Sequence, residues 1–251
     1  MIRRTLLFVF IVVHTNWATA QPTAPANSAR LFSLQSLHDQ CIEFSEVKVG
    51  KDDIDVGDCR VSAFGSFGSI GPRTYYYALY CLIPNDRMQH GRCDSESFHA
   101  RYHETRALAI FVEEEASGQA TLLIERASLD IGLFVYEQPE IIENAFGTLL
   151  FVPIRLDGTG VGNVSEYYLW HQDKAEWRRL DAETWLQDLR KRIPPGLHIW
   201  KGIWPNLQRM TAEAGLYQDG DAQASPTGGT ARIELHIDNG RFAVKSVTLS
   251  K

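Results

Sequence analysis

The chain has 251 residues, of which 44% are hydrophobic and 22% are charged, and its formal net charge at pH 7 is −6. This composition is that of a folded globular protein, and it excludes collagen-like, low-complexity and wholly disordered chains. The acidic balance argues against binding to nucleic acid, because that partner requires a basic surface.

The N-terminus has the pattern of a secretory signal peptide. Arg3 and Arg4 form a positive start, a short apolar run follows, and Ala18-Thr19-Ala20 supplies small residues for cleavage. We therefore expect a signal peptide over residues 1–20. Its removal would lower the Lys and Arg total from 25 to 23 against 31 acidic residues, a net charge of −8. The alternatives are a buried N-terminal helix or an uncleaved anchor, but the apolar run is shorter than the ~20 residues of a membrane span.

The rest of the chain divides into a short leader and a folded part. Residues 21–30 are rich in Ala, Pro, Asn and Ser, which predicts a disordered leader. We expect residues 31–251 to form a single mostly β domain, or two β units that meet near residues 127–146. No later segment is long and apolar enough to cross a bilayer, so no membrane span is expected after signal cleavage.

Four cysteines lie in the first half of the chain: Cys41, Cys59, Cys81 and Cys93. An even number of cysteines in an exported protein favours disulfide bonds. Three pairings are possible. We favour Cys41–Cys59 with Cys81–Cys93, because each pair closes a short loop worth about 3 kcal/mol. A zinc site is the alternative, which the lack of a Cys-x-x-Cys spacing disfavours. We also infer that this half has the weaker core.

In chain order, the local patterns are mainly those of strands. A short helix is expected over 31–40, and an acidic loop over 52–58. Three glycines and Pro72 predict a flexible turn over 65–72. Alternating or apolar runs predict strands over 60–64, 74–83, 107–112, 121–125, 133–136, 141–142, 148–156, 166–170, 177–180, 231–237 and 241–249. Between the last two, Asn239-Gly240 supplies the positive φ angles of a type I′ turn.

One helix stands out in the second half of the chain. Asp181 fits an N-cap, and Trp185 and Leu189 then fall on one face at helical spacing before Pro194 ends the helix. A second short helix is expected over 205–214. Many strands with one or two short helices predict an α+β fold that is predominantly antiparallel β.

The templates for catalysis match this sequence poorly. His99 and His103 are four residues apart and Glu104 follows, but the second histidine of the zincin motif is missing, so no metal site is predicted. Ser66 and Ser69 each have the following glycine of a nucleophile elbow but lack the preceding one. The glycine-rich run at 158–162 precedes a strand instead of a helix, so no cofactor is expected.

Aromatic residues are numerous, and most of them fit core packing. The segment 197–205 is the most loop-like aromatic stretch, and Trp200, Lys201 and Trp204 are its candidate binding residues. Amphipathic rings of this kind anchor interfaces with proteins or glycans.

These observations support one leading hypothesis and two alternatives. The leading hypothesis is a non-enzymatic periplasmic or secreted binding module, such as an inhibitor, an immunity-type protein or an envelope-assembly factor. One alternative is an exported hydrolase with an unrecognised site, for which His99, His103 and Glu104 are the first candidates. The other is a carbohydrate-binding module that uses Trp200 and Trp204.

Overall fold

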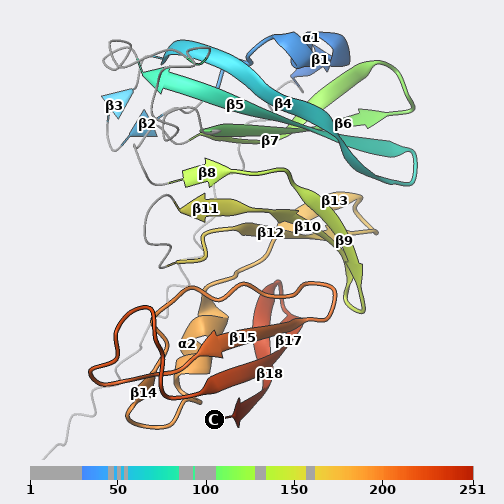
Figure 1. Ribbon diagram of the computed structural model, residues 1–251. Coiled ribbons are helices and arrows are strands. Elements are labelled where there is room, and N and C mark those ends of the chain that lie inside the picture. Colours follow the sequence, from blue (N-terminus) through green and yellow to red (C-terminus); the bar gives the residue numbers. More distant parts are fainter. Residues whose placement is uncertain are drawn as a thin grey trace, which may run out of the picture. The chain divides into compact units, whose positions relative to one another are not determined.

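The computed structural model describes eight stretches of the chain, namely residues 30–44, 48–49, 52–53, 56–84, 93, 106–127, 134–156 and 162–250. The predicted signal peptide and nearly all of the predicted leader lie outside the described residues, as do His99, His103 and Glu104. The described part is mostly antiparallel β with two short helices (Figure 1), which confirms the predicted α+β fold class. No helix within it is long and apolar enough to cross a membrane.

The first sheet has the strand order β1-β7-β6-β5-β4, and all neighbouring strands are antiparallel. Alternate residues of β5 enter two different cores: Tyr80 packs with Leu37 of the first helix, whereas Leu79 packs with the middle sheet. The elements of this region are β1 (Leu31–Ser33), α1 (Leu34–Asp39), β2 (Lys48–Val49), β3 (Asp52–Asp53), β4 (Val56–Ile70), β5 (Arg73–Pro84), β6 (Ala107–Glu114) and β7 (Gln119–Ala127).

The predicted turn over 65–72 is wrong for most of its length. Strand β4 continues to Ile70, and only Gly71 and Pro72 form the turn. Gly68 serves close packing instead of chain reversal, since a Cβ atom there would lie 2.8 Å from Cδ1 of Ile141. The strand absorbs its irregular sequence through shifts in register, one of them between Ser66 and Gly68.

Two further predictions in this region are corrected by strand pairing. The helix expected over 31–40 is helical only from Leu34, because Leu31–Ser33 pair with β7. The acidic loop expected over 52–58 contains β3 and the first residues of β4. In both places cross-strand hydrogen bonding outweighs the local composition.

The middle sheet has the order β13-β12-β10-β9, and the short pair β8–β11 lies next to it in the chain. Its two faces are both buried: Leu150 and Tyr168 pack with the first sheet, whereas Leu149 and Tyr167 pack with the C-terminal elements. Its strands are β9 (Glu140–Asn144), β10 (Gly147–Val152), β12 (Glu166–His171) and β13 (Glu176–Arg179), and the pair consists of β8 (Phe134–Tyr136) and β11 (Ile154–Leu156). Pro153 separates β10 from β11, because proline has no N–H to donate to a ladder.

The C-terminal elements form a three-stranded sheet of order β15-β17-β18 that packs with one helix. The predicted type I′ turn is confirmed, since Asn239 and Gly240 have φ angles of 49° and 75°. The elements are α2 (Thr184–Arg190), β14 (Leu197–His198), β15 (Thr211–Gly215), β16 (Tyr217–Gln218), β17 (Thr230–Asp238) and β18 (Arg241–Ser250).

The predicted helix over 205–214 is wrong. Asn206 and Thr211 exchange backbone hydrogen bonds across a tight turn, and strand β15 begins at Thr211. Ala212 and Ala214 are buried on one face of this strand while Glu213 between them is exposed. The period of this segment is therefore two, and pairing with β17 makes it a strand.

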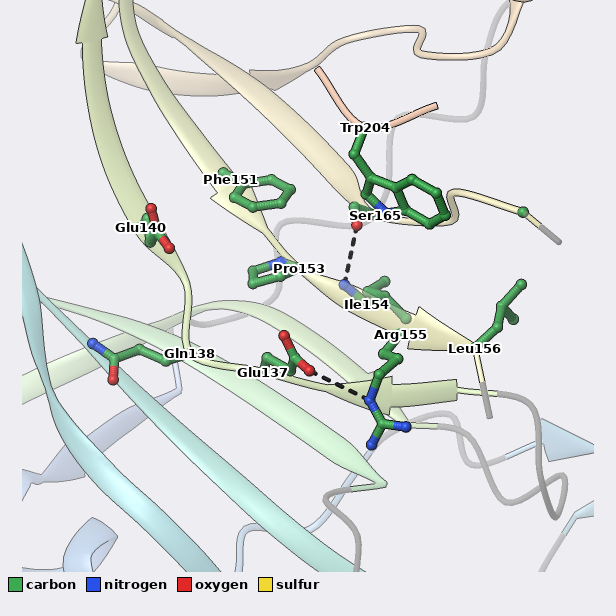
Figure 2. Close-up of a pocket in the computed structure, with 11 residues that line it drawn as sticks. Glu137, Gln138, Glu140, Phe151, Pro153, Ile154, Arg155, Leu156, Ser165 and Trp204 are labelled. Atoms are coloured by element: carbon green, nitrogen blue, oxygen red, sulfur yellow. Dashed lines mark hydrogen bonds and ion pairs between the residues drawn. The ribbon is translucent and has the colours of Figure 1, made fainter. Parts of the chain in front are cut away.

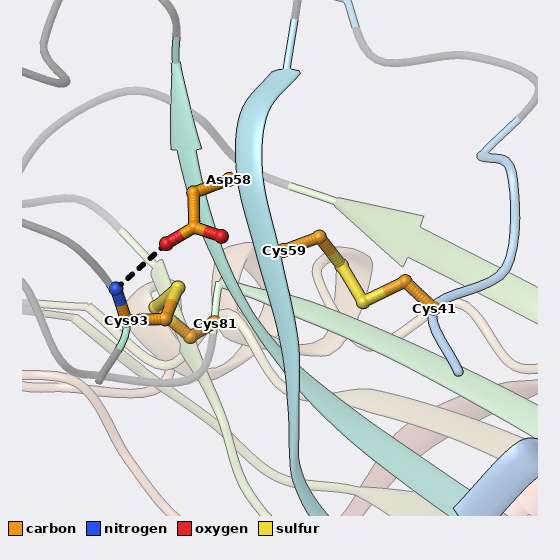
Figure 3. Close-up of a disulfide and its surroundings, with 5 residues drawn as sticks. All are labelled: Cys41, Asp58, Cys59, Cys81 and Cys93. Carbon is orange, nitrogen blue, oxygen red and sulfur yellow. Dashed lines mark hydrogen bonds between the residues drawn. A yellow bond between two sulfur atoms is a disulfide. The ribbon is translucent and has the colours of Figure 1, made fainter. Parts of the chain in front are cut away.

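Two disulfide bonds tie the first region together (Figure 3). Cys41 is bonded to Cys59 and Cys81 to Cys93, with Cα–Cα distances of 6.3 and 5.9 Å, which confirms the favoured pairing. Asp58, next to Cys59, accepts a hydrogen bond of 3.0 Å from the backbone N–H of Cys93. Bonds of this kind are typical of exported proteins that fold in an oxidising compartment.

Candidate functional site

A groove of about 730 Å³ opens beside Pro153, at the junction of β10 and β11 (Figure 2). Phe151, Pro153 and Trp204 supply its apolar surface. Glu137, Glu140 and Arg155 supply its charged groups. An open apolar groove with a few polar groups at its border is the usual form of a binding site.

The register of three strands places Phe151 and Glu140 next to each other. Phe151 on β10 is directly opposite Glu140 on β9 and Tyr167 on β12. Opposite residues in an antiparallel sheet point to the same face. The rings of Phe151 and Tyr167 stack with centroids 5.3 Å apart, and Tyr167 is only 2% exposed. Phe151 therefore extends the core outward to the groove, with Glu140 beside it.

Trp204 reaches the groove from a different segment, whose backbone is held in place. The Asn163 side chain donates two hydrogen bonds from Nδ2, to Ile203 O at 2.8 Å and to the Tyr167 hydroxyl at 2.9 Å. Ile203 is 3% exposed, whereas the adjacent Trp204 is 50% exposed. Two residues before Trp204, Gly202 also packs against Asn163, so closely that a Cβ atom there would lie 2.6 Å from the backbone N of Asn163. The indole is thus exposed on a fixed backbone.

The charges of the groove are unevenly paired. Arg155 Nε lies 3.5 Å from Glu137 Oε1, and both side chains are about half exposed. Gln138 Oε1 accepts a hydrogen bond of 3.1 Å from the Tyr77 hydroxyl. The side-chain carboxylate of Glu140 makes no hydrogen bond or ion pair with any residue that the structure describes. Two carboxylates and one guanidinium thus give the groove a formal charge of −1.

The candidate residues predicted from the sequence line two different hollows. Trp204 lines the groove, whereas Trp200 and Lys201 line a second hollow of about 340 Å³ against α2. Trp200 is 47% exposed, and its ring centroid lies 6.5 Å from that of Tyr217. The structure thus places Trp200 and Trp204 on the same segment but in separate surroundings.

Sequence reasoning missed Glu137, Glu140, Phe151 and Arg155. The signal that was available is Pro153, since a proline inside a strand pattern marks an edge or an interruption. The register that brings Glu140 beside Phe151 is set by tertiary pairing and has no local signature.

A buried ionic cluster joins the first sheet to the middle sheet. Arg126 Nε donates to Glu166 Oε1 at 2.9 Å, and Arg126 Nη2 donates to the Tyr168 hydroxyl at 2.9 Å. The Tyr168 hydroxyl in turn donates to Glu166 Oε2. Burial opposes ionisation of Glu166, but the hydrogen bonds from Arg126 and Tyr168 outweigh it, so the pKa of Glu166 lies below its ordinary value. Because its charges are paired within the cluster, we assign it a structural role at the contact between the two sheets.

Comparison with known proteins adds no assignment: no family model matches the chain, and no curated protein matches it at a significant level. Across the described stretches, no group of three or more His, Cys, Asp or Glu side chains could hold a metal ion. The arrangement around Trp204 is suited to binding, because it combines an exposed ring, an apolar floor and an unpaired charge.

Proposed function

We propose that the protein is an exported binding module that holds a protein partner at the groove beside Trp204. The observation that carries this proposal is the half-exposed indole of Trp204 on a backbone pinned by Asn163 and Ile203. A fixed aromatic ring loses little conformational entropy on binding, and rings of this kind dominate the energy of protein interfaces.

Export is supported by two independent features. The first is the signal-peptide pattern of the N-terminus, with cleavage expected after Ala20. The second is the pair of disulfides, Cys41–Cys59 and Cys81–Cys93, which persist in oxidising compartments such as the periplasm or the extracellular space.

The alternatives find less support in the groove. The hydrolase hypothesis depends on His99, His103 and Glu104, which lie outside the described residues. A carbohydrate-binding module would use Trp200 and Trp204 as one platform, but these two residues line different hollows. A protein partner requires only one anchoring ring with polar groups around it.

The proposal is tested by comparing three forms of the mature protein as bait in extracts of the native cell envelope. The wild type and Trp200→Ala should retain the same partner, identified by mass spectrometry and then shown to bind as a purified protein. Trp204→Ala should lose it by at least about tenfold in affinity, as expected for an interface hot spot. Equal binding of the purified partner by all three forms would refute the groove as the binding surface.

A further inference from the structure

The protein already contains one complete example of an arginine held between an aromatic ring and a carboxylate. Arg73 lies over the Trp170 ring, with Cζ 5.6 Å from the centroid, and its Nη2 is 2.9 Å from Glu114 Oε1. Its Nη1 also donates to the carbonyl oxygen of Ala175 at 2.6 Å. A planar guanidinium can make these contacts together, because it stacks by its face and donates along its edge.

The groove presents the same residue types without the cation. Trp204 and Phe151 supply rings, and Glu140 supplies a carboxylate that is directly opposite Phe151 in the β9–β10 register. In the view of Figure 2 Phe151 lies between Glu140 and Trp204, and all three line the groove. The guanidinium of Arg155 does not fill this role, because in the same view it is turned toward Glu137.

Electrostatics favour a positively charged occupant. Glu137 and Arg155 balance one another, so the carboxylate of Glu140 gives the groove its net negative charge. The whole chain is also acidic, with a formal net charge of −6. A basic group therefore gains from both the local and the overall charge, whereas an acidic group is repelled.

We infer that the groove binds an arginine side chain on the surface of the partner protein, an inference that rests on the proposed function. The guanidinium stacks on an aromatic ring and donates to the Glu140 carboxylate. Arginine fits better than lysine, because its fork matches a carboxylate and its flat face is weakly hydrated. A volume of about 730 Å³ accommodates this side chain with its neighbours in the partner chain.

The test uses three capped tripeptides as probes, acetyl-Gly-X-Gly-amide, in which X is arginine, lysine or citrulline. Citrulline has the shape of arginine without its charge. Binding is followed by NMR through the indole N–H signal of Trp204, which is assigned by its absence in Trp204→Phe. The arginine peptide should shift this signal, with an affinity about tenfold above that of citrulline and severalfold above that of lysine.

Two protein variants form a matched pair on the same strand. Glu140→Gln should weaken the arginine peptide by about tenfold and abolish its advantage over citrulline. Glu143→Gln should leave the affinity unchanged, because residue 143 is on the opposite face of β9. Glu143 is exposed and accepts a hydrogen bond from the Thr148 hydroxyl, and the amide oxygen of glutamine can accept the same bond.

The outcomes separate this inference from the proposed function. Equal binding of the arginine and citrulline peptides, or an unchanged affinity in Glu140→Gln, would overturn the arginine assignment. The arginine assignment would also fail if the arginine peptide caused no shift while binding of the partner still depended on Trp204. The proposed function would stand in that case. If cellobiose shifts the Trp204 signal and the arginine peptide does not, the occupant is a saccharide, and both proposals fail.

Discussion

The two regions of the molecule hold their connecting segments by different chemistry. In the first region, residues 30–127, the disulfides attach the segment after α1 to β4 and the end of β5 to Cys93. In the second region, residues 134–250, there is no cysteine, and polar side chains that bind the backbone hold the loops without any crosslink. The first region therefore adds covalent bonds to hydrogen bonds such as that of Asp58 with Cys93, whereas the second depends on hydrogen bonds without disulfides.

Asp221 and Asp181 show how the second region does this. Asp221 accepts hydrogen bonds of 2.8 Å from the backbone N–H groups of Gln218 and Thr227, and one of 2.7 Å from the Thr227 hydroxyl. Asp181 accepts from the backbone N–H groups of Glu183 and Thr184 at the start of α2. Each carboxylate therefore satisfies several donors that the loop or the helix leaves free.

The clustering of the cysteines predicts that the core of the first region is the weaker one, and this stays a prediction. The first region does have a core, since Tyr75, Tyr80 and Phe111 are at most 1% exposed. Each disulfide joins a cysteine within a paired strand, Cys59 or Cys81, to one outside the strands, Cys41 or Cys93. Such a bond stabilises the fold mainly by restricting the unfolded chain.

The largest expected effect comes from breaking the joint between the two regions. Glu166→Ala removes a carboxylate whose side chain is 8% exposed and leaves Arg126 without an opposite charge to pair with. We expect a loss of about 3–4 kcal/mol in the free energy of unfolding, measured by urea denaturation. The double variant Arg126→Met with Glu166→Leu should recover most of it, because no unpaired charge is then buried. A loss below about 1 kcal/mol in Glu166→Ala would show that the regions are joined by apolar packing alone.

Removing the disulfide that closes the longer loop should weaken the first region selectively. Cys41→Ser combined with Cys59→Ser opens a bond between residues 18 apart in sequence. We expect a loss of about 3 kcal/mol, and faster amide hydrogen exchange in β4 with little change in β15, β17 and β18. Similar acceleration in both regions would mean that they unfold as one unit. The disulfide would then not stabilise the first region separately from the second.

Acidification should weaken the hydrogen bonds that hold a loop of the second region. Hydrogen bonds from the backbone N–H groups of Gln218 and Thr227 lower the pKa of Asp221, and the bond from the Thr227 hydroxyl adds to this. A lowered folded-state pKa contributes stability that is present above the unfolded value of about 3.9 and is lost as pH falls through the folded value. Hydrogen exchange of residues 218–227, corrected for intrinsic rates, should therefore accelerate below about pH 4.

Asp221→Asn is the control for this pH dependence. The amide retains one acceptor oxygen but does not titrate, so exchange in residues 218–227 should be faster at pH 6 and should change little on acidification. If the variant retains the acid response of the wild type, another group is responsible for it.

The smallest expected effect on stability is at the groove itself. Trp204→Ala should change the free energy of unfolding by less than about 0.5 kcal/mol, because half of this side chain is already exposed. Ile203→Ala, one residue earlier and 3% exposed, should cost about 2–4 kcal/mol. Thermal unfolding of the two variants measures this difference. A large loss in Trp204→Ala would assign the indole to the core and weaken the case for a binding surface.

Local sequence signals were reliable where a feature depends on neighbouring residues. The turn at Asn239-Gly240 and the two strands that pair as β12 and β13 were predicted, because turn residues and alternation act over a few positions. The turn expected over 65–72 and the helix expected over 205–214 failed, because pairing with distant strands decided both segments. At the candidate site, Trp204 was proposed from its loop-like surroundings, whereas Glu140 and Phe151 were not.

The amino-acid sequence alone determined the β-rich class, favoured one of three disulfide pairings and marked the aromatic segment that contains Trp204 as a candidate. These depend on composition, loop length and short patterns, which act locally along the chain. Only the tertiary structure decided that Phe151 and Glu140 are neighbours and that Trp200 and Trp204 face different hollows. The reason is physical: strand register and the packing of one sheet on another are set by contacts between residues far apart in the chain, and no local pattern encodes them.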